Sequence, residues 1–325
     1  MKLQQSHIQI FGVISKDFNK KISFFKELKD LKTQITQDGS LSLYSLNYEE
    51  GFHNTDGALK ESISKYLLPA ELDQFARKKK IVVLDVCVGL GYNTGCILEE
   101  LLKRNQKIEW HGLEIDQRPL GIALNEKTFQ KLWSPKVLDF FNCLKKSGKW
   151  RKGFNEGTIH WGDARQQIFE IQDSQMFDLI LLDPFSPQKC PELWSEQFIS
   201  LLSSKLSLDG RLITYSSAAS IRASFKKAGL KIYSIIPSMN AQNKWSSGTV
   251  AMKKTLEQQF ISANCHLKNL SARELEHLTT RSSIPYRDPT SRGSSKHIIL
   301  TREIEQSKSQ LINTSSWRKK WNAAQ

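Results

Sequence analysis

Four short strand-like segments lie in the middle of the chain, and a turn with glycine or acidic residues closes each of them. They are residues 81–84, 109–116, 157–161 and 177–182. The first is apolar throughout and mostly β-branched, which is typical of a parallel strand buried on both faces. Open α/β sheets bind ligands at the carboxyl ends of their strands. The pattern therefore predicts a Rossmann-like α/β fold with a binding site at that edge.

The flanking regions have different patterns. Weak alternation in 1–56 predicts a small N-terminal β extension, and a helix is expected to follow it. Leucine and isoleucine recur at a rough helical period in 255–280, and a closing helix is expected at the end of the chain. We therefore divide the chain into the extension, a Rossmann-like ligand-binding domain at 57–252, and a helical, basic C-terminal extension at 253–325.

A glycine turn follows the first strand-like segment and leads into a helical segment. Gly89 and Gly91 let the backbone approach a ligand closely, and the helix N-terminus presents unpaired N–H groups. Glycines at this position also serve packing alone in many proteins. The residues predicted to bind a cofactor around this turn are Asp85, Gly89, Gly91 and Asn93.

An acid follows the second segment at the interval where dinucleotide folds place a ribose-binding carboxylate. Glu114 is the candidate, because a carboxylate accepts two hydrogen bonds from a ribose diol. A negative charge there also disfavours a phosphate on the same hydroxyls, which argues against NADP. Alternatively, Glu114 or Asp116 caps the next helix.

The third and fourth segments end in Gly162-Asp163 and in Asp183-Pro184. This series resembles the motif order of S-adenosylmethionine-dependent methyltransferases, which implies a fold and cofactor of that class. Thr94 stands where a nicotinamide-binding turn would have its third glycine, which disfavours that cofactor. The resemblance makes Asp163 a partner for the adenine amino group, with a solvent-facing turn as the alternative.

One position departs from the methyltransferase pattern. The usual motif reads acid-x-G-x-G-x-G, and Cys87 replaces its first glycine. We therefore expect that a positive backbone dihedral is not needed at Cys87.

A longer signature follows the fourth strand. The run from Leu182 to Trp194, LDPFSPQKCPELW, resembles the LDGF-x-P-x-K-x-P-x-x-W segment of the tRNA 5-methylaminomethyl-2-thiouridine methyltransferases, the methyltransferase domain of MnmC and its stand-alone relatives. Segments at 209–230, 48–53 and 284–289 are also similar to that family. The resemblance covers roughly residues 36 to 300.

The resemblance implies methyl transfer from S-adenosylmethionine to the primary amine of 5-aminomethyl-(2-thio)uridine at the tRNA wobble position. Because it uses nearly all of the 325 residues, no flavin oxidase domain, and hence no flavin, is expected. Asp183 is the predicted catalytic residue, since a carboxylate can hold the amine and assist its loss of a proton. It is also counted among the residues predicted to bind the cofactor. Phe185 is expected to pack on the base or the methionine. Asp178 is a competing acid that we expect to end the preceding helix or loop.

The charge of the chain favours a polyanionic partner. Lysine and arginine total 47 against 33 acidic residues, which gives a net charge of +14 and a pI near 9.5. The basic clusters lie at 77–80, 145–152 and 317–321, and phosphate contact is their predicted use. A membrane surface or solubility alone could also account for the charge. The tryptophans of the last cluster either stack on a base of the tRNA anticodon stem-loop or dock on the core.

Neither a metal nor a membrane is expected. The 5 cysteines form no C-x-x-C pair and have no histidine at ligand spacing. No N-terminal signal core is visible, and no apolar run approaches the roughly 20 residues that span a bilayer. The sequence therefore predicts a cytoplasmic protein.

Two alternative functions stay open at this point. An aminopropyltransferase of the spermidine-synthase type shares the fold but uses a cationic polyamine, which a basic protein repels. A non-catalytic RNA-binding protein with a methyltransferase fold is the other, because Cys87 changes the cofactor turn.

Overall fold

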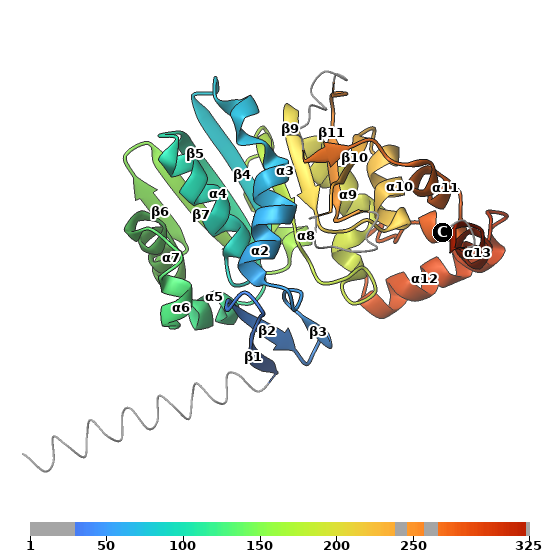
Figure 1. Cartoon of the computed structure of the whole chain (residues 1–325), viewed down its shortest axis with the longest axis horizontal. Coiled ribbons are helices and arrows are strands. Elements are labelled where there is room, and N and C mark those ends of the chain that lie inside the picture. Colours follow the sequence, from blue (N-terminus) through green and yellow to red (C-terminus); the bar gives the residue numbers. More distant parts are fainter. Residues whose placement is uncertain (1–29, 238–245, 257–265, 323–325) are drawn as a thin grey trace, which may run out of the picture.

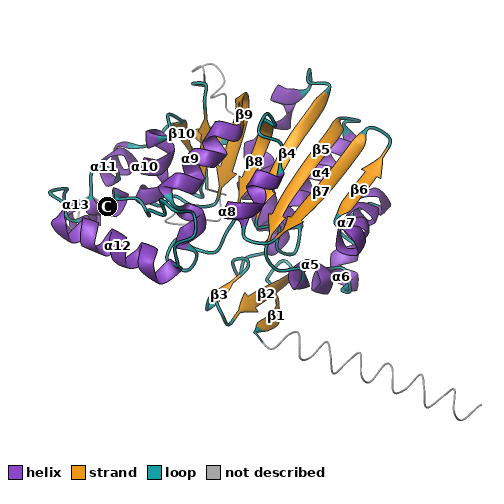
Figure 2. Cartoon of the chain, turned by 180° about the vertical axis from the view of Figure 1, so that it is seen from behind, coloured by secondary structure: helices purple, strands orange, loops and turns teal. Residues whose placement is uncertain are grey.

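The computed structural model describes residues 30–237, 246–256 and 266–322. A large mixed sheet crosses this part of the molecule in the order β12-β10-β11-β9-β8-β4-β5-β7-β6 (Figures 1 and 2). Its strands are β4 (Lys80–Val86), β5 (Lys107–Glu114), β6 (Lys149–Lys152), β7 (Asn155–Trp161), β8 (Phe177–Leu182), β9 (Leu206–Thr214), β10 (Lys231–Ile235), β11 (Thr249–Met252) and β12 (Leu267–Lys268).

The strand order places a topological switch at β4. From β4 the chain moves outwards through β5 to β7, and it then returns to β8 on the other side of β4 and continues to β9. These five strands are parallel, whereas β6, β11 and β12 each pair antiparallel with a neighbour. Ligands bind at such a switch, beyond the carboxyl ends of the strands. The predicted Rossmann-like α/β fold is confirmed.

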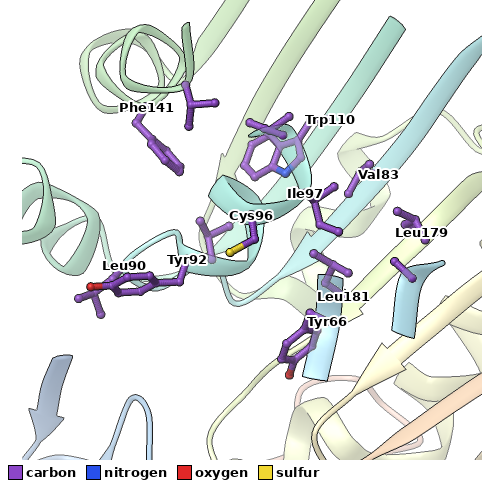
Figure 3. Packing of buried hydrophobic residues seen from close by; sticks show 14 of the residues in the cluster. Tyr66, Val83, Leu90, Tyr92, Cys96, Ile97, Trp110, Phe141, Leu179 and Leu181 are labelled. Carbon is purple, nitrogen blue, oxygen red and sulfur yellow. The ribbon is translucent and has the colours of Figure 1, made fainter. Parts of the chain in front are cut away.

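Helices cover both faces of the sheet and create two cores (Figures 1 and 2). On one face Val83 and Leu179 pack under α4, as the close view of this core shows (Figure 3). On the other face Val82 and Leu84 pack with Phe198 of α9. The helices of these layers are α2 (Ala58–Ser62), the π-helical η1 (Ile63–Leu67), α3 (Leu68–Ala70), η2 (Leu72–Phe75), α4 (Tyr92–Lys103), α5 (Arg118–Ala123), α6 (Lys127–Gln130), α7 (Pro135–Ser147), α8 (Ala164–Gln167), η3 (Ile168–Glu170), η4 (Pro191–Trp194), α9 (Glu196–Lys205) and α10 (Ala219–Lys227).

A small antiparallel sheet precedes the first helix of the described residues, as the sequence predicted. It consists of β1 (Leu31–Ile35), β2 (Leu41–Ser45) and β3 (Glu50–Gly51). It lies at one end of the large sheet (Figure 1), and the backbone N–H of Ser186, beyond β8, donates to Glu50. Residues 1–29 of the predicted N-terminal element lie outside the described residues.

The region at 255–280, predicted to be helical, is helical only in part. Residues 257–265 lie outside the described residues, Leu267 and Lys268 form β12, and a helix is found only at Ala272–His277 (α11). The helical prediction is wrong at β12. The side chain of Leu267 is buried there because its strand pairs with Ile235 of β10 at the edge of the sheet. The predicted closing helix is confirmed. The remaining elements are η6 (Arg281–Ser283), α12 (Ser295–Lys308) and α13 (Thr314–Asn322).

A buried ion pair joins α10 to α11. The guanidinium of Arg222 donates to Glu274 at 2.9 Å, and both side chains are almost fully buried. Arg222 also donates to the hydroxyls of Thr249 and Ser246. Removing one partner of a buried pair leaves the other charge unpaired in the low-dielectric interior of the protein.

We expect Arg222→Met to lower the free energy of unfolding by about 3–5 kcal/mol, because Glu274 would stay buried without its partner. Urea denaturation measures this change. Lys226→Met, on the exposed side of the same helix, is the control and should change stability by less than about 0.5 kcal/mol. A loss under about 1 kcal/mol for Arg222→Met would show that the pair does not hold the two helices together.

Candidate active site

A cavity of about 760 Å³ lies at the carboxyl ends of β4, β5, β7 and β8, with the N-terminal sheet as its opposite wall. Its size lies within the range typical of sites for cofactors and drug-sized ligands. The predicted site residues that line it are Gly89, Glu114, Asp163, Asp183 and Phe185. Three others, Asp85, Gly91 and Asn93, lie behind this surface.

The glycine turn takes a left-handed backbone at three positions. Cys87, Gly89 and Gly91 have φ angles of 70°, 56° and 95°. The expectation that Cys87 needs no positive dihedral is therefore wrong. The N–H of Cys87 still bonds to Leu113 of β5, so the turn begins before the strand pairing ends. A non-glycine residue in this region costs of order 1–3 kcal/mol, and here it points a thiol into the cavity.

Gly91 is required by packing as well as by its dihedral. A Cβ at this position would lie 2.9 Å from the ring of Phe141 on α7. The backbone of the turn therefore packs directly against α7, and a larger residue at Gly91 would push the two apart.

Asp85 supports the turn from behind. The hydroxyl of Thr94 donates to Asp85, and the other carboxylate oxygen has no hydrogen-bond partner in the structure. Burial raises the pKa of Asp85 to about 7. Because Asp85 does not line the cavity, its link to Thr94 ties the end of β4 to the start of α4. Thr94 therefore has a structural use at the position where a dinucleotide-binding turn has glycine.

Glu114 joins the turn to the end of β5. One of its carboxylate oxygens accepts from the N–H of Gly89 at 2.8 Å, and the other accepts from the N–H of Asp116 at 2.8 Å. Each oxygen has a second lone pair, so the carboxylate can also accept from a diol in the cavity. Burial raises the pKa of Glu114. The N–H of Arg118 bonds to Asp116 and not to Glu114, so Asp116 serves the start of the next helix.

Asp163 is the N-cap of α8 and is partly buried. Its carboxylate accepts from the backbone N–H of Arg165 at 2.9 Å and from the guanidinium of the same residue. Arg165 also donates to Asp288 at 2.6 Å, which brings the C-terminal segment at 284–289 to the cavity wall. Asp163 is thus a helix-capping acid at the cavity wall, and 36% of its side chain is exposed.

Two side chains hold Asp183 in place. The hydroxyl of Tyr66 donates to one carboxylate oxygen at 2.5 Å, and the amide of Asn93 donates to the other at 2.7 Å. The backbone N–H of Tyr215 in turn donates to the Tyr66 hydroxyl at 3.3 Å. Burial raises the pKa of Asp183 to about 8, although both hydrogen bonds oppose the shift.

Aromatic rings surround Phe185. Tyr48 stacks on it with ring centroids 4.4 Å apart, and Phe52 meets it edge-on at 5.0 Å. The indole N–H of Trp194 donates to the carbonyl of Phe185 at 2.7 Å, which gives the tryptophan of the LDPFSPQKCPELW segment a structural use. The acid at the end of β8 therefore lies beside an aromatic wall.

The competing acid, Asp178, does not reach the cavity. It lies inside β8, at the opposite end of the strand from Asp183, and accepts from the N–H of Val82 at 3.0 Å. The prediction that it ends a helix or loop is wrong. Lys78 donates to it as well, and Lys80 pairs with Glu109, so two lysines of the cluster at 77–80 hold strand starts together.

For the tryptophans of the cluster at 317–321 the sequence left two alternatives, and the structure decides between them at Trp317. Its ring stacks on His277 with centroids 4.1 Å apart, and its indole N–H donates to the carbonyl of Arg273. Trp317 is 5% exposed, so it docks on the protein.

Sequence reasoning missed the cavity residues that come from the N-terminal sheet and from the helix after it. The 48–53 segment resembles the family, but no local pattern places its side chains in the cavity, and only the fold brings them near the glycine turn. They are Tyr48, Glu50, Phe52, Glu61 and Lys65. Tyr215, just after β9, was also missed, as was Tyr66, which does not line the cavity but donates its hydroxyl to Asp183. Among the residues described, no three histidine, cysteine, aspartate or glutamate side chains gather as metal ligands, and no helix is long and apolar enough to cross a membrane.

Comparisons with known proteins point to methyltransferases. A family model described as S-adenosyl-L-methionine-dependent methyltransferase matches residues 128–249. The crystal structure of MnmC2 from Aquifex aeolicus superposes with a TM-score of 0.71 at 25% identity, covering 92% of this chain and 98% of the Aquifex chain.

Two curated relatives are similar in sequence. An uncharacterized protein of Methanocaldococcus jannaschii is 27% identical over 95% of this chain and 82% of its own length. The tRNA 5-methylaminomethyl-2-thiouridine biosynthesis bifunctional protein MnmC of Azoarcus sp. is 27% identical over 58% of this chain, and the match spans 31% of that protein.

Fold, site and comparisons together define an S-adenosylmethionine-dependent methyltransferase. The residues present suit that cofactor: the cavity is large enough, Glu114 retains lone pairs for a diol, and the turn at Gly89 is open to the cavity. Within this class, the chain is similar to MnmC-like methyltransferases in sequence and in structure.

Proposed function

We propose that the chain N-methylates the aminomethyl group of 5-aminomethyl-(2-thio)uridine at the wobble position of tRNA. The observation that carries this proposal is the position of Asp183, a half-buried carboxylate held by Tyr66 and Asn93 beside the ring of Phe185. An acid suits a cationic amine, and an aromatic wall suits a nucleobase. The name of the MnmC relatives supports this choice of substrate.

Each side chain then has a definite task. S-adenosylmethionine, when bound, supplies a methyl group on a sulfonium and leaves as a neutral thioether. Asp183 accepts a hydrogen bond from the acceptor amine, takes its proton and aims its lone pair. Tyr66 and Asn93 fix the carboxylate so that its position is set before the substrate arrives. Glu114 holds the ribose, and Asp163 accepts from the adenine.

Exposed lysines near the cavity support an RNA partner. Arg118 at the start of α5 lines the cavity, and Lys145 of α7 reaches back to the carbonyl of Gly121 in α5. Further exposed lysines on or beside α6 and α7 are Lys127, Lys131, Lys136, Lys146 and Lys149. Phosphate contacts by such side chains make RNA affinity fall as salt concentration rises.

The decisive experiment is methyl transfer from labelled S-adenosylmethionine to tRNA that carries 5-aminomethyl-2-thiouridine, followed by nucleoside mass analysis. We expect the methylaminomethyl nucleoside to appear as the aminomethyl nucleoside is consumed. Transfer to a polyamine or to another nucleoside, with this tRNA unchanged, would overturn the proposal. Tight tRNA binding without any S-adenosylmethionine binding would favour a non-catalytic RNA-binding protein.

A further inference from the structure

A partly buried ion pair lines the cavity and has no part in the chemistry described so far. Lys65 of η1 donates to Glu61 of α2, and the two side chains are 16% and 13% exposed. The second oxygen of Glu61 accepts from the N–H of Asn54 at 2.8 Å. Both residues face the same space as Asp183. Burial makes a charge at this position effective, because water screens it little.

The order of the strands indicates which part of the cofactor lies there. Across the sheet, β7 leads to Asp163, β5 to Glu114, β4 to the turn at Gly89, and β8 to Asp183. Neighbouring strands are about 4.8 Å apart, so this series spans about 14 Å. S-adenosylmethionine has its adenine, ribose, sulfonium and amino acid in the same linear order. With adenine and ribose at β7 and β5, the amino acid end falls near β8.

Lys65 belongs to that end of the cavity. It directly precedes Tyr66, whose hydroxyl bonds to Asp183 after β8, and its ammonium lies 5.6 Å from the ring centroid of Tyr215. The ammonium has three N–H groups, and one of them is donated to Glu61.

The charges of the cavity leave few other partners for a carboxylate. Most of its charged lining residues are acidic, and the lysine and arginine residues among the described lining are Lys65 and Arg118. Arg118 is engaged by Asp30 and Asp116, each within hydrogen-bond distance, near the ribose end. An α-carboxylate at the β8 end therefore meets Lys65 as its cation.

We propose that Lys65 and Glu61 form the subsite for the amino acid end of S-adenosylmethionine. Lys65 donates to the α-carboxylate, and Glu61 accepts from the α-ammonium. Each charge of the zwitterionic amino acid end therefore faces a side chain of the opposite charge. The subsite also makes the enzyme selective, because a cofactor that lacks the α-carboxylate gains nothing from Lys65. The inference rests on the cofactor and is independent of the RNA substrate.

The test compares two ligands by isothermal titration calorimetry without any RNA. Lys65→Met should raise the Kd for S-adenosylmethionine by about 10- to 100-fold, as expected for a lost charge-assisted hydrogen bond. The Kd for decarboxylated S-adenosylmethionine should change by less than about twofold, because that ligand has no carboxylate to lose. Lys60→Met, an exposed lysine one turn earlier, is the matched control and should leave both values unchanged.

Lys65→Gln provides a second variant, since its amide can still donate to Glu61 without carrying a charge. It should show the same selective loss, and Lys65→Arg should recover part of the affinity. An equal loss for both ligands would assign Lys65 a structural role and overturn the proposal. Unchanged S-adenosylmethionine affinity together with weaker tRNA binding would make Lys65 a phosphate contact instead.

Discussion

Asp183→Asn is expected to lower the kcat of methyl transfer by about 10²- to 10⁴-fold, the usual range for loss of a general base. The change replaces the carboxylate by an amide of the same shape, so the hydrogen bonds to Tyr66 and Asn93 can rearrange without a cavity. We expect the Kd for S-adenosylmethionine to stay the same, because the assigned role of Asp183 is toward the acceptor amine.

The pH profile of the wild type gives a second readout. Below the pKa of about 8, Asp183 carries a proton and cannot take one from the amine, so kcat/KM should rise with pH through that value. The amine of the substrate titrates in the same direction. The difference between the profiles of the wild type and Asp183→Asn therefore isolates the carboxylate.

The sign of the stability change follows from the same pKa. Because folding raises the pKa of Asp183, the folded state binds more protons than the unfolded state between about pH 4 and pH 8. This acid therefore makes the folded state less stable as pH rises through that window. At pH 7 the Tm of Asp183→Asn should equal or exceed that of the wild type, which separates lost activity from lost folding.

Glu49→Gln is the matched control for the loss of one carboxylate. Glu49 lies near the same loops but outside the cavity lining, and it pairs with Lys189 at the surface. It should leave kcat unchanged. Full turnover by Asp183→Asn at neutral pH, with unchanged cofactor affinity, would remove Asp183 from the catalytic role.

Glu114→Ala is expected to raise the Kd for S-adenosylmethionine by about 100-fold. The change removes the acceptor for the ribose diol, and each hydrogen bond to a charged group contributes about 1.5–3 kcal/mol. It also leaves the N–H of Gly89 without its partner, so the turn loses its link to β5. Calorimetric titration measures the effect without any RNA.

Glu109→Ala provides the comparison for this variant. Glu109 lies on the same strand, but at its other end and outside the cavity. Its removal should leave the Kd within about twofold of the wild type. Normal binding of S-adenosylmethionine by Glu114→Ala would show that the ribose assignment is wrong.

The central strands and the residues that follow them could be predicted because their signals are local. A strand buried on both faces is apolar over its whole length, and a turn that approaches a ligand carries glycine. Asp163, Glu114 and Asp183 then fall at one edge, since the carboxyl ends of parallel strands lie together.

Errors arose where a residue's partner is remote in sequence. Cys87 takes a left-handed backbone although it is not glycine, and its N–H bonds to Leu113 of the neighbouring strand β5. Asp178 reads as a loop acid until Lys78 and Val82 are found beside it, about a hundred positions earlier. Leu267 fits a helical period and instead pairs at the edge of the sheet.

The sequence by itself determined the class of fold, the class of cofactor and the acids at the strand ends. Only the tertiary structure decided what surrounds them. Tyr66 reaches Asp183 across 117 positions, and no local pattern showed that Lys65 or the ring of Tyr48 would lie beside it. The physical reason is that the amino-acid composition of a strand indicates by itself whether the strand is buried. The hydrogen-bond and charge partners of a side chain, in contrast, come close only after distant segments have packed together.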